Sequence, residues 1–90
     1  MAPMARVHIP SAMRDLTQGR SSIDVPGETV CQLVEGLETQ FPGLAARLVE
    51  DGRIRPGLQV FVDGETRRAG LRTKVSASSE VFFLQALGGG

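Results

Sequence analysis

One amphipathic helix lies between segments of alternating polarity, and this change of period restricts the fold of the chain more than any other feature. After residue 28 the apolar residues recur at helical spacing, which puts them on one face of a helix. These residues are Val30, Leu33, Val34, Leu37 and Phe41. A helix with one apolar face needs an apolar surface to cover, so the strands around it should form one sheet against which it packs.

The sequence also marks the two ends of this helix. Thr29 is the expected N-cap, and Gln32 three residues later completes a capping-box pattern. Gly36 inside the helix costs about 1 kcal/mol relative to alanine, and it allows close packing of a neighbouring segment. Pro42-Gly43 ends the helix, and residues 44–49 predict a short second helix.

Before the helix, two alternating segments predict an opening β-hairpin. Residues 6–10 alternate and end on a proline, residues 16–20 are typical of a loop, and residues 21–25 alternate again. In the second of these strands Ile23 and Val25 should face inward.

After the helix, residues 58–62 predict a strand, and Asp63-Gly64 is typical of a hairpin turn into a return strand at residues 65–67. Residues 53–57 and 68–79 are expected to be connectors. Leu71 and Val75 should anchor the second connector.

The last strand, residues 80–84, is apolar almost throughout, which is typical of a central strand buried between neighbours. Placed beside the first strand, it gives a β-grasp (ubiquitin-like) fold of the α+β class, with a mixed sheet of four to five strands around one main helix. Because side chains alternate across a strand, one of Phe82 and Phe83 should enter the core, and the sequence leaves open which. We expect residues 1–87 to form a single β-grasp domain.

The composition argues against several classes of protein. Ninety residues, of which 41% are hydrophobic and 22% charged, fit one folded domain. A formal net charge of zero argues against a nucleic-acid partner. No apolar run approaches the about 20 residues of a membrane helix, and the first residues lack a signal-peptide core. We therefore expect a cytoplasmic protein with no membrane partner, and the single cysteine fits a reducing compartment.

Charge is unevenly distributed along the chain. Residues 24–51 contain six acidic residues and one basic residue, whereas residues 53–74 contain six basic and two acidic residues. This pattern predicts either an acidic and a basic side that steer a protein partner or an ordinary mixed surface, and the sequence does not decide between them.

Few side chains suggest catalysis or metal binding. His8 has no serine, cysteine or aspartate at catalytic spacing, so we expect it to be structural or surface-facing. Cys31, in the first helical turn, could accept sulfur, but we expect a small, partly buried packing residue. Because no metal-ligand spacing is present either, the prediction is a protein that is not an enzyme and binds no metal.

The chain ends on Gly88, Gly89 and Gly90, shortly after the last strand. Three glycines make a thin, flexible tail that reaches roughly 10 Å and can enter a slot that rejects side chains. The carboxylate at its tip would then be the reactive group. The alternative is a disordered terminus or linker without function.

Two segments together resemble a known family. The ending, residues 81–90, has a strand, a short linker and a terminal diglycine, and the opening has Val7-His8-Ile9-Pro10 followed by residues 25–30. With the strand order and the size, they resemble the ubiquitin-like sulfur carriers, a family that includes the small subunit of molybdopterin synthase, the thiamin sulfur carrier and the carrier of a cysteine pathway. Ile9-Pro10 and residues 41–44 look most like the cysteine-pathway branch. The third glycine departs from the family's diglycine, so either Gly90 belongs to the functional pair or it is an extra residue.

The resemblance implies that the carrier supplies the reactive chain end and that partner enzymes carry out the chemistry on it. An adenylyltransferase resembling ubiquitin-activating enzyme would use ATP and Mg²⁺ to activate the Gly90 carboxylate, and a sulfur donor would convert it into a thiocarboxylate. An acceptor enzyme would then take the sulfur, and the carrier itself would bind no cofactor. The side chains expected to contact partners are Phe82, Gln85 and Leu87 on the last strand and linker, and the basic residues Arg67, Arg68 and Arg72.

Other functions remain open at this point. A ubiquitin-like modifier would use the same activated carboxylate to form isopeptide bonds with lysines, and a molybdopterin synthase small subunit would serve one particular acceptor. A non-covalent interaction module would not need the tail. The sulfur acceptor and the oligomeric state are not specified by the sequence.

Overall fold

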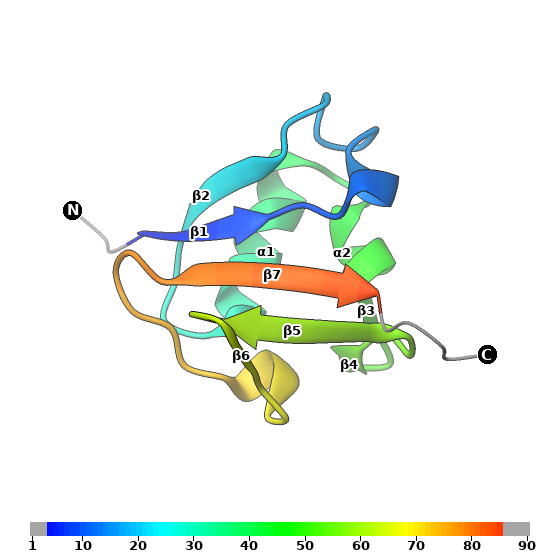
Figure 1. The fold of residues 1–90 in the computed structure, drawn as a ribbon. Helices are drawn as coiled ribbons and strands as arrows, with labels where there is room; N and C mark the ends of the chain where they lie inside the picture. Colours follow the sequence, from blue (N-terminus) through cyan, green and yellow to red (C-terminus); the bar gives the residue numbers. More distant parts are fainter. Residues whose placement is uncertain (1–3, 86–90) are drawn as a thin grey trace.

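The computed structural model describes residues 4–85, and its main feature is a mixed sheet covered on one face by helices (Figure 1). The sheet consists of β1 (Met4–His8), β2 (Ser22–Pro26), β5 (Leu58–Val62), β6 (Glu65–Thr66) and β7 (Glu80–Gln85). The α-helices are α1 (Val30–Gln40) and α2 (Leu44–Leu48). Smaller elements are the strands β3 (Val49–Glu50) and β4 (Arg53–Ile54) and the 3-10 helices η1 (Ser11–Met13) and η2 (Gly70–Arg72).

The strand order of the sheet confirms the β-grasp prediction. The order is β2-β1-β7-β5-β6, so the last strand lies at the centre, beside the first. β1 and β7 run parallel, with Val7 opposite Val81, and the other pairs in the sheet are antiparallel. The predicted hairpin of β1 and β2 is present, with Ile23 and Val25 both buried.

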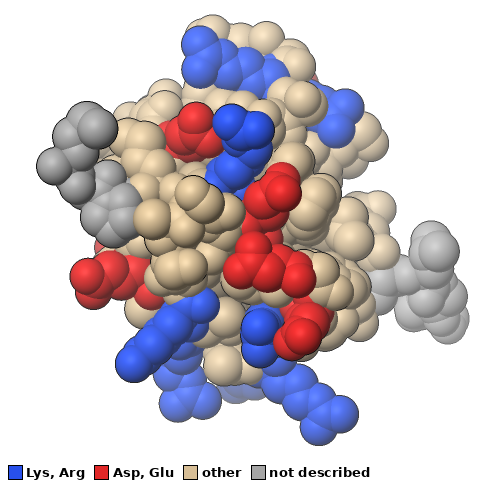
Figure 2. Space-filling view, turned by 60° about the vertical axis from the view of Figure 1, so that its left-hand side comes forward, with Lys and Arg blue, Asp and Glu red and all other residues tan. Residues whose placement is uncertain are grey.

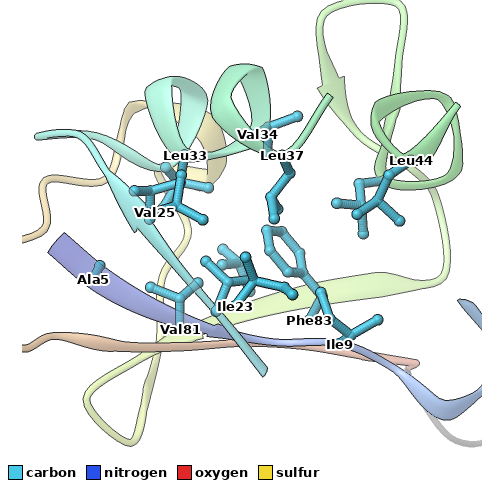
Figure 3. Close-up of a cluster of buried hydrophobic side chains, with 14 of the residues drawn as sticks. Ala5, Ile9, Ile23, Val25, Leu33, Val34, Leu37, Leu44, Val81 and Phe83 are labelled. Atoms are coloured by element: carbon cyan, nitrogen blue, oxygen red, sulfur yellow. The ribbon is translucent and has the colours of Figure 1, made fainter. Parts of the chain in front are cut away.

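The core lies between the sheet and the two helices. Figure 3 shows Phe83 projecting from β7 into the space between the layers, toward Leu37 of α1 and Leu44 of α2. All three side chains are at most 1% exposed. Burial of a side chain of this size contributes about 1.5–3 kcal/mol, so the apolar stripe of the helix and the inward residues of the strands together stabilise the fold.

The start of α1 confirms the predicted cap, with one difference. Thr29 Oγ1 accepts a hydrogen bond from the backbone N–H of Gln32 at 3.2 Å. The Gln32 side chain reaches back to the N–H of Glu28, at 2.7 Å, and not to that of the cap residue itself. Both bonds satisfy donors that lie at or before the first turn, where the helix supplies no acceptor.

The turn between the helices is held by one carboxylate. Glu38 accepts hydrogen bonds from the backbone N–H groups of Gly43 and Ala45, at 3.0–3.1 Å. The bond from Gly43, followed by that from Ala45, lowers the pKa of Glu38 below its ordinary value, because both bonds favour the charged form. Gly43 has a φ of 100°, which a glycine adopts without steric cost.

Gly36 packs directly against β2, as its place in the helix suggested. A Cβ atom at this position would lie 2.6 Å from Cγ1 of Val25. Alanine normally stabilises a helix by about 1 kcal/mol relative to glycine, but a methyl group forced into a packed core costs about 1–3 kcal/mol. We expect Gly36→Ala to lower the free energy of unfolding by about 1 kcal/mol, measured by urea denaturation followed by far-UV circular dichroism.

A second background tests this reason. In Val25→Ala the clashing methyl group is absent, so the added Gly36→Ala change should be neutral or stabilising. Equal destabilisation in both backgrounds would contradict the packing explanation.

The structure corrects three expectations. The connector at residues 53–57 contains β4, which pairs with β3, and the connector at residues 68–79 contains η2, although Leu71 and Val75 do pack against the core as predicted. Cys31 is exposed and is not a packing residue. β7 is central in the sheet as predicted, and its apolar residues are divided between the core and the opposite face of the sheet.

Candidate functional site

The face of the sheet opposite α1 carries no covering element among residues 4–85, and it faces the viewer in Figure 1. Strand alternation places on this face the residues that lie between the buried ones. They are Arg6 and His8 of β1, Asp24 of β2, Gln59 and Phe61 of β5, and Glu80, Phe82 and Leu84 of β7. We call this set the open face.

An aromatic cluster lies at the centre of the open face. Phe82 is opposite Phe61 in the antiparallel pair and beside His8 in the parallel pair. The rings of His8 and Phe82 are stacked, with centroids 3.9 Å apart and planes 2° from parallel. His8 Nε2 lies 2.8 Å from a carboxylate oxygen of Glu80. These contacts hold the Phe82 ring in one orientation while leaving it half-buried, and they confirm that His8 faces the surface.

The apolar surface continues toward the end of β7. Leu84 is 46% exposed and pairs with Gln59, and the exposed Gln85 pairs with Leu58. Gln85 is the last residue that the structure describes. The predicted contact residue Leu87 and the glycines Gly88, Gly89 and Gly90 lie outside the described residues.

Two shallow hollows flank the end of β7. One, of about 420 Å³, is lined by residues that include His8, Pro10, Arg14 and Leu84. The other, of about 340 Å³, is lined by residues that include Arg47, Arg55, Leu58 and Gln85. The surface is therefore uneven on both sides of the end of this strand.

The three arginines predicted to bind partners line two adjoining hollows near β6 and η2 and lie apart from Phe82 and Gln85. Arg67 forms an ion pair with Glu65 at 3.3 Å. Arg68 and Arg72 line a cleft of about 490 Å³ beside η2, together with Arg53, which the sequence analysis did not single out. Because β5 separates β7 from β6, this cleft is a surface distinct from Phe82 and Gln85.

Charges of both signs occur on one side of the molecule. Figure 2 shows a band of acidic side chains with basic side chains above and below it. This view favours a mixed surface over one acidic and one basic side. The lower basic group lies at the height of β6 and η2 in Figure 1.

The described residues offer little for metal binding or membrane insertion. Among residues 4–85, no three His, Cys, Asp or Glu side chains lie close enough together to hold a metal ion. Within the same range, no helix combines the length and the apolar character that crossing a bilayer requires.

One protein family matches the chain over most of its length. It is the ThiS family, which matches residues 7–90, a range that includes the open face except Arg6 and also the glycines. The chain belongs to the ThiS family. The match confirms the resemblance on which the sequence analysis relied.

Individual relatives of this ThiS-family chain agree with the fold. The sulfur carrier protein CysO of Mycobacterium tuberculosis is 29% identical over 89 residues, which cover 93% of this chain and 96% of that protein. The small archaeal modifier protein 3 of Haloferax volcanii is 31% identical over 64 residues, which cover 69% of this chain and 70% of that protein. A chain in the crystal structure of the BexX/CysO complex of Amycolatopsis orientalis is 31% identical with a TM-score of 0.88, covering 96% of this chain and 99% of that one.

Proposed function

We propose that the protein is a sulfur carrier that delivers sulfur as a thiocarboxylate on its terminal glycine. The observation that carries this proposal is the ThiS-family match over residues 7–90, which spans both the sheet and the glycines. The likeness to the sulfur carrier CysO over nearly the full length supports it. The open face supplies a surface that a partner can bind while it handles the chain end.

The proposed chemistry takes place on partner enzymes and has two steps. The carboxylate of Gly90 attacks the α-phosphorus of ATP, with Mg²⁺ held by the partner, and pyrophosphate leaves. A sulfur nucleophile then attacks the acyl carbon and AMP leaves, so that sulfur replaces one carboxylate oxygen. The carrier contributes a glycine end small enough for a narrow channel and a folded body for recognition, and it needs no catalytic side chain of its own.

In this proposal Phe82, Leu84 and Gln85 contact the partner. Aromatic side chains that are ordered but accessible are frequent energetic centres of protein interfaces. Phe82 meets both conditions because it is stacked on His8 and half-buried. The final acceptor of the sulfur, whether cysteine, molybdopterin or another metabolite, is a property of the acceptor enzyme.

A second candidate function is a ubiquitin-like protein modifier. The specific observation in its favour is the likeness to small archaeal modifier protein 3. Both functions begin with an activated carboxylate, and they differ in whether sulfur or a lysine amine displaces AMP.

The intact mass of the protein purified from its native host tests the proposal. We expect a form that is heavier by the difference between one sulfur and one oxygen atom. This form should react with a thiol-alkylating reagent, because the sulfur of a thiocarboxylate is a much stronger nucleophile toward such reagents than a carboxylate oxygen. The exposed Cys31 would also react, so the alkylation is measured in the Cys31→Ser variant.

Two results would decide against sulfur transfer. One is a carrier that keeps its unmodified mass when incubated with its activating enzyme, ATP, Mg²⁺ and sulfide. The other is a set of adducts on lysines of other proteins without any thiocarboxylate form, which would favour the modifier.

A further inference from the structure

Basic side chains line the cleft beside η2, although the chain has no formal net charge. It lies between β4 and η2 and has a volume of about 490 Å³. Arg53, Arg68 and Arg72 line it, all with exposed side chains, and Ile54 and Leu71 add apolar surface.

These three arginines have no acidic partner among residues 4–85, a property they share with Arg14, Arg20 and Arg47, which do not line this cleft. Arg6, Arg55 and Arg67 form ion pairs with Asp24, Glu50 and Glu65, at 3.2–3.6 Å. Among residues 4–85, no carboxylate lies within ion-pair distance of Arg53, Arg68 or Arg72. Three like charges around one cleft repel each other, and an anionic group bound between them would relieve this repulsion.

The cleft continues toward the open face. A neighbouring hollow of about 230 Å³ shares Ile54, Arg68 and Gly70 with it and extends to Leu58 and Gln59. These two residues pair with Gln85 and Leu84 at the end of β7. The two hollows form one groove from Arg72 to the edge of the open face, which we call the basic groove.

We propose that the basic groove binds an acidic peptide segment, with an apolar side chain at its centre, that belongs to the partner enzyme acting on the chain end. Carboxylates of the segment pair with the three arginines, and the apolar side chain contacts Ile54 and Leu71. The identity of the partner rests on the proposed function, whereas the binding of an acidic segment does not. The contact fixes the direction from which the partner approaches the end of β7.

Two other ligands fit the groove less well. A nucleic acid would place phosphates along a longer path, and the chain has no net positive charge to hold them. A free phosphate would leave the apolar surface of Ile54 and Leu71 unused. The charge and the apolar contact together favour a peptide.

The test uses the whole chain and a defined probe, the peptide acetyl-Asp-Glu-Leu-Glu-Asp-amide, in an NMR titration of backbone amides at low salt. We expect shifts concentrated at Ile54, Gly70, Leu71 and Arg72. The triple change Arg53→Gln, Arg68→Gln and Arg72→Gln should weaken binding about tenfold, because exposed ion pairs each contribute modestly. A double variant, Arg68→Gln with Arg72→Gln, should be intermediate, and the double variant Arg20→Gln with Arg47→Gln serves as its charge-matched control and should bind like the wild type.

Several results would overturn the proposal. They are no shifts at saturating peptide, shifts spread over all arginines, equal loss of binding in the charge-matched control, and equal binding of inorganic phosphate or a single-stranded RNA oligonucleotide at the same residues. A variant lacking Gly89 and Gly90 should bind the peptide normally. If peptide binding fails while sulfur loading succeeds, the groove assignment is wrong and the carrier function stands. If the peptide binds while sulfur loading fails, the groove assignment stands and the carrier function is wrong.

Discussion

Removal of Gly89 and Gly90 abolishes sulfur loading and leaves the fold unchanged. The loss should be complete. The truncated chain still ends on a carboxylate, but its tail is two residues shorter, so the carboxylate no longer reaches the catalytic centre of the activating enzyme. When a reacting group is misplaced by a few ångström, the enzyme loses the rate acceleration that comes from holding the reactants in the correct geometry. The measurement is the intact mass after incubation with the activating enzyme, ATP, Mg²⁺ and sulfide.

The controls separate chemistry from folding. The amide spectrum of residues 4–85 should match that of the full chain, because the buried core of the described residues is built from positions between Ala5 and Phe83. Deletion of Gly90 alone tests whether the third glycine is used: full loading of this variant would identify Gly88-Gly89 as sufficient. Normal sulfur loading of the doubly truncated chain would contradict the proposed role of the terminal glycines. Absence of loading in the full chain, with cellular function unchanged by the truncation, would favour a non-covalent interaction module.

The sequence predicted the fold well because the fold depends on patterns that are local. The helical spacing of Val30, Leu33 and Leu37 requires an apolar surface to pack on, and the flanking strand patterns indicated that a sheet supplies it. The apolar last strand indicated its central place. The short elements β4 and η2 were missed for a physical reason. Residues 53–54 and 70–72 are too short to show a period, and tertiary contacts with neighbouring segments determine their structure.

The candidate site was predicted only in part, since it depends on which face of the sheet a residue occupies. Alternation showed that one of Phe82 and Phe83 points outward. Which of the two does so follows from the register of β7 with β1 and β5. The role of Arg53 could not be found from the sequence, because it comes close to Arg68 and Arg72 only through the packing of β4 beside η2. The excess of basic residues in residues 53–74 was the one sequence signal that indicated a basic surface in this part of the chain.

The neighbouring residues Phe82 and Phe83 allow docking and folding to be tested separately with the same substitution. Phe83 is 1% exposed, so Phe83→Ala should lower the free energy of unfolding by about 3–5 kcal/mol. Phe82→Ala should cost about 1 kcal/mol, mainly through loss of the stacking with His8. Urea denaturation followed by far-UV circular dichroism measures both values, because the chain has no tryptophan or tyrosine to report by fluorescence.

When sulfur loading is measured, Phe82→Ala should be the more impaired of the two variants, although Phe83→Ala is the less stable one. Loss of an aromatic side chain at the centre of an interface costs at least about 2 kcal/mol, so Phe82→Ala should raise the KM of the activating enzyme for the carrier about 30-fold. Phe83→Ala, measured at a temperature where it stays folded, should load with a nearly normal KM because its ring faces the core. Equal KM values for Phe82→Ala and the wild type would show that partners do not bind the open face, and the docking surface would then have to lie elsewhere, with the basic groove as the next candidate.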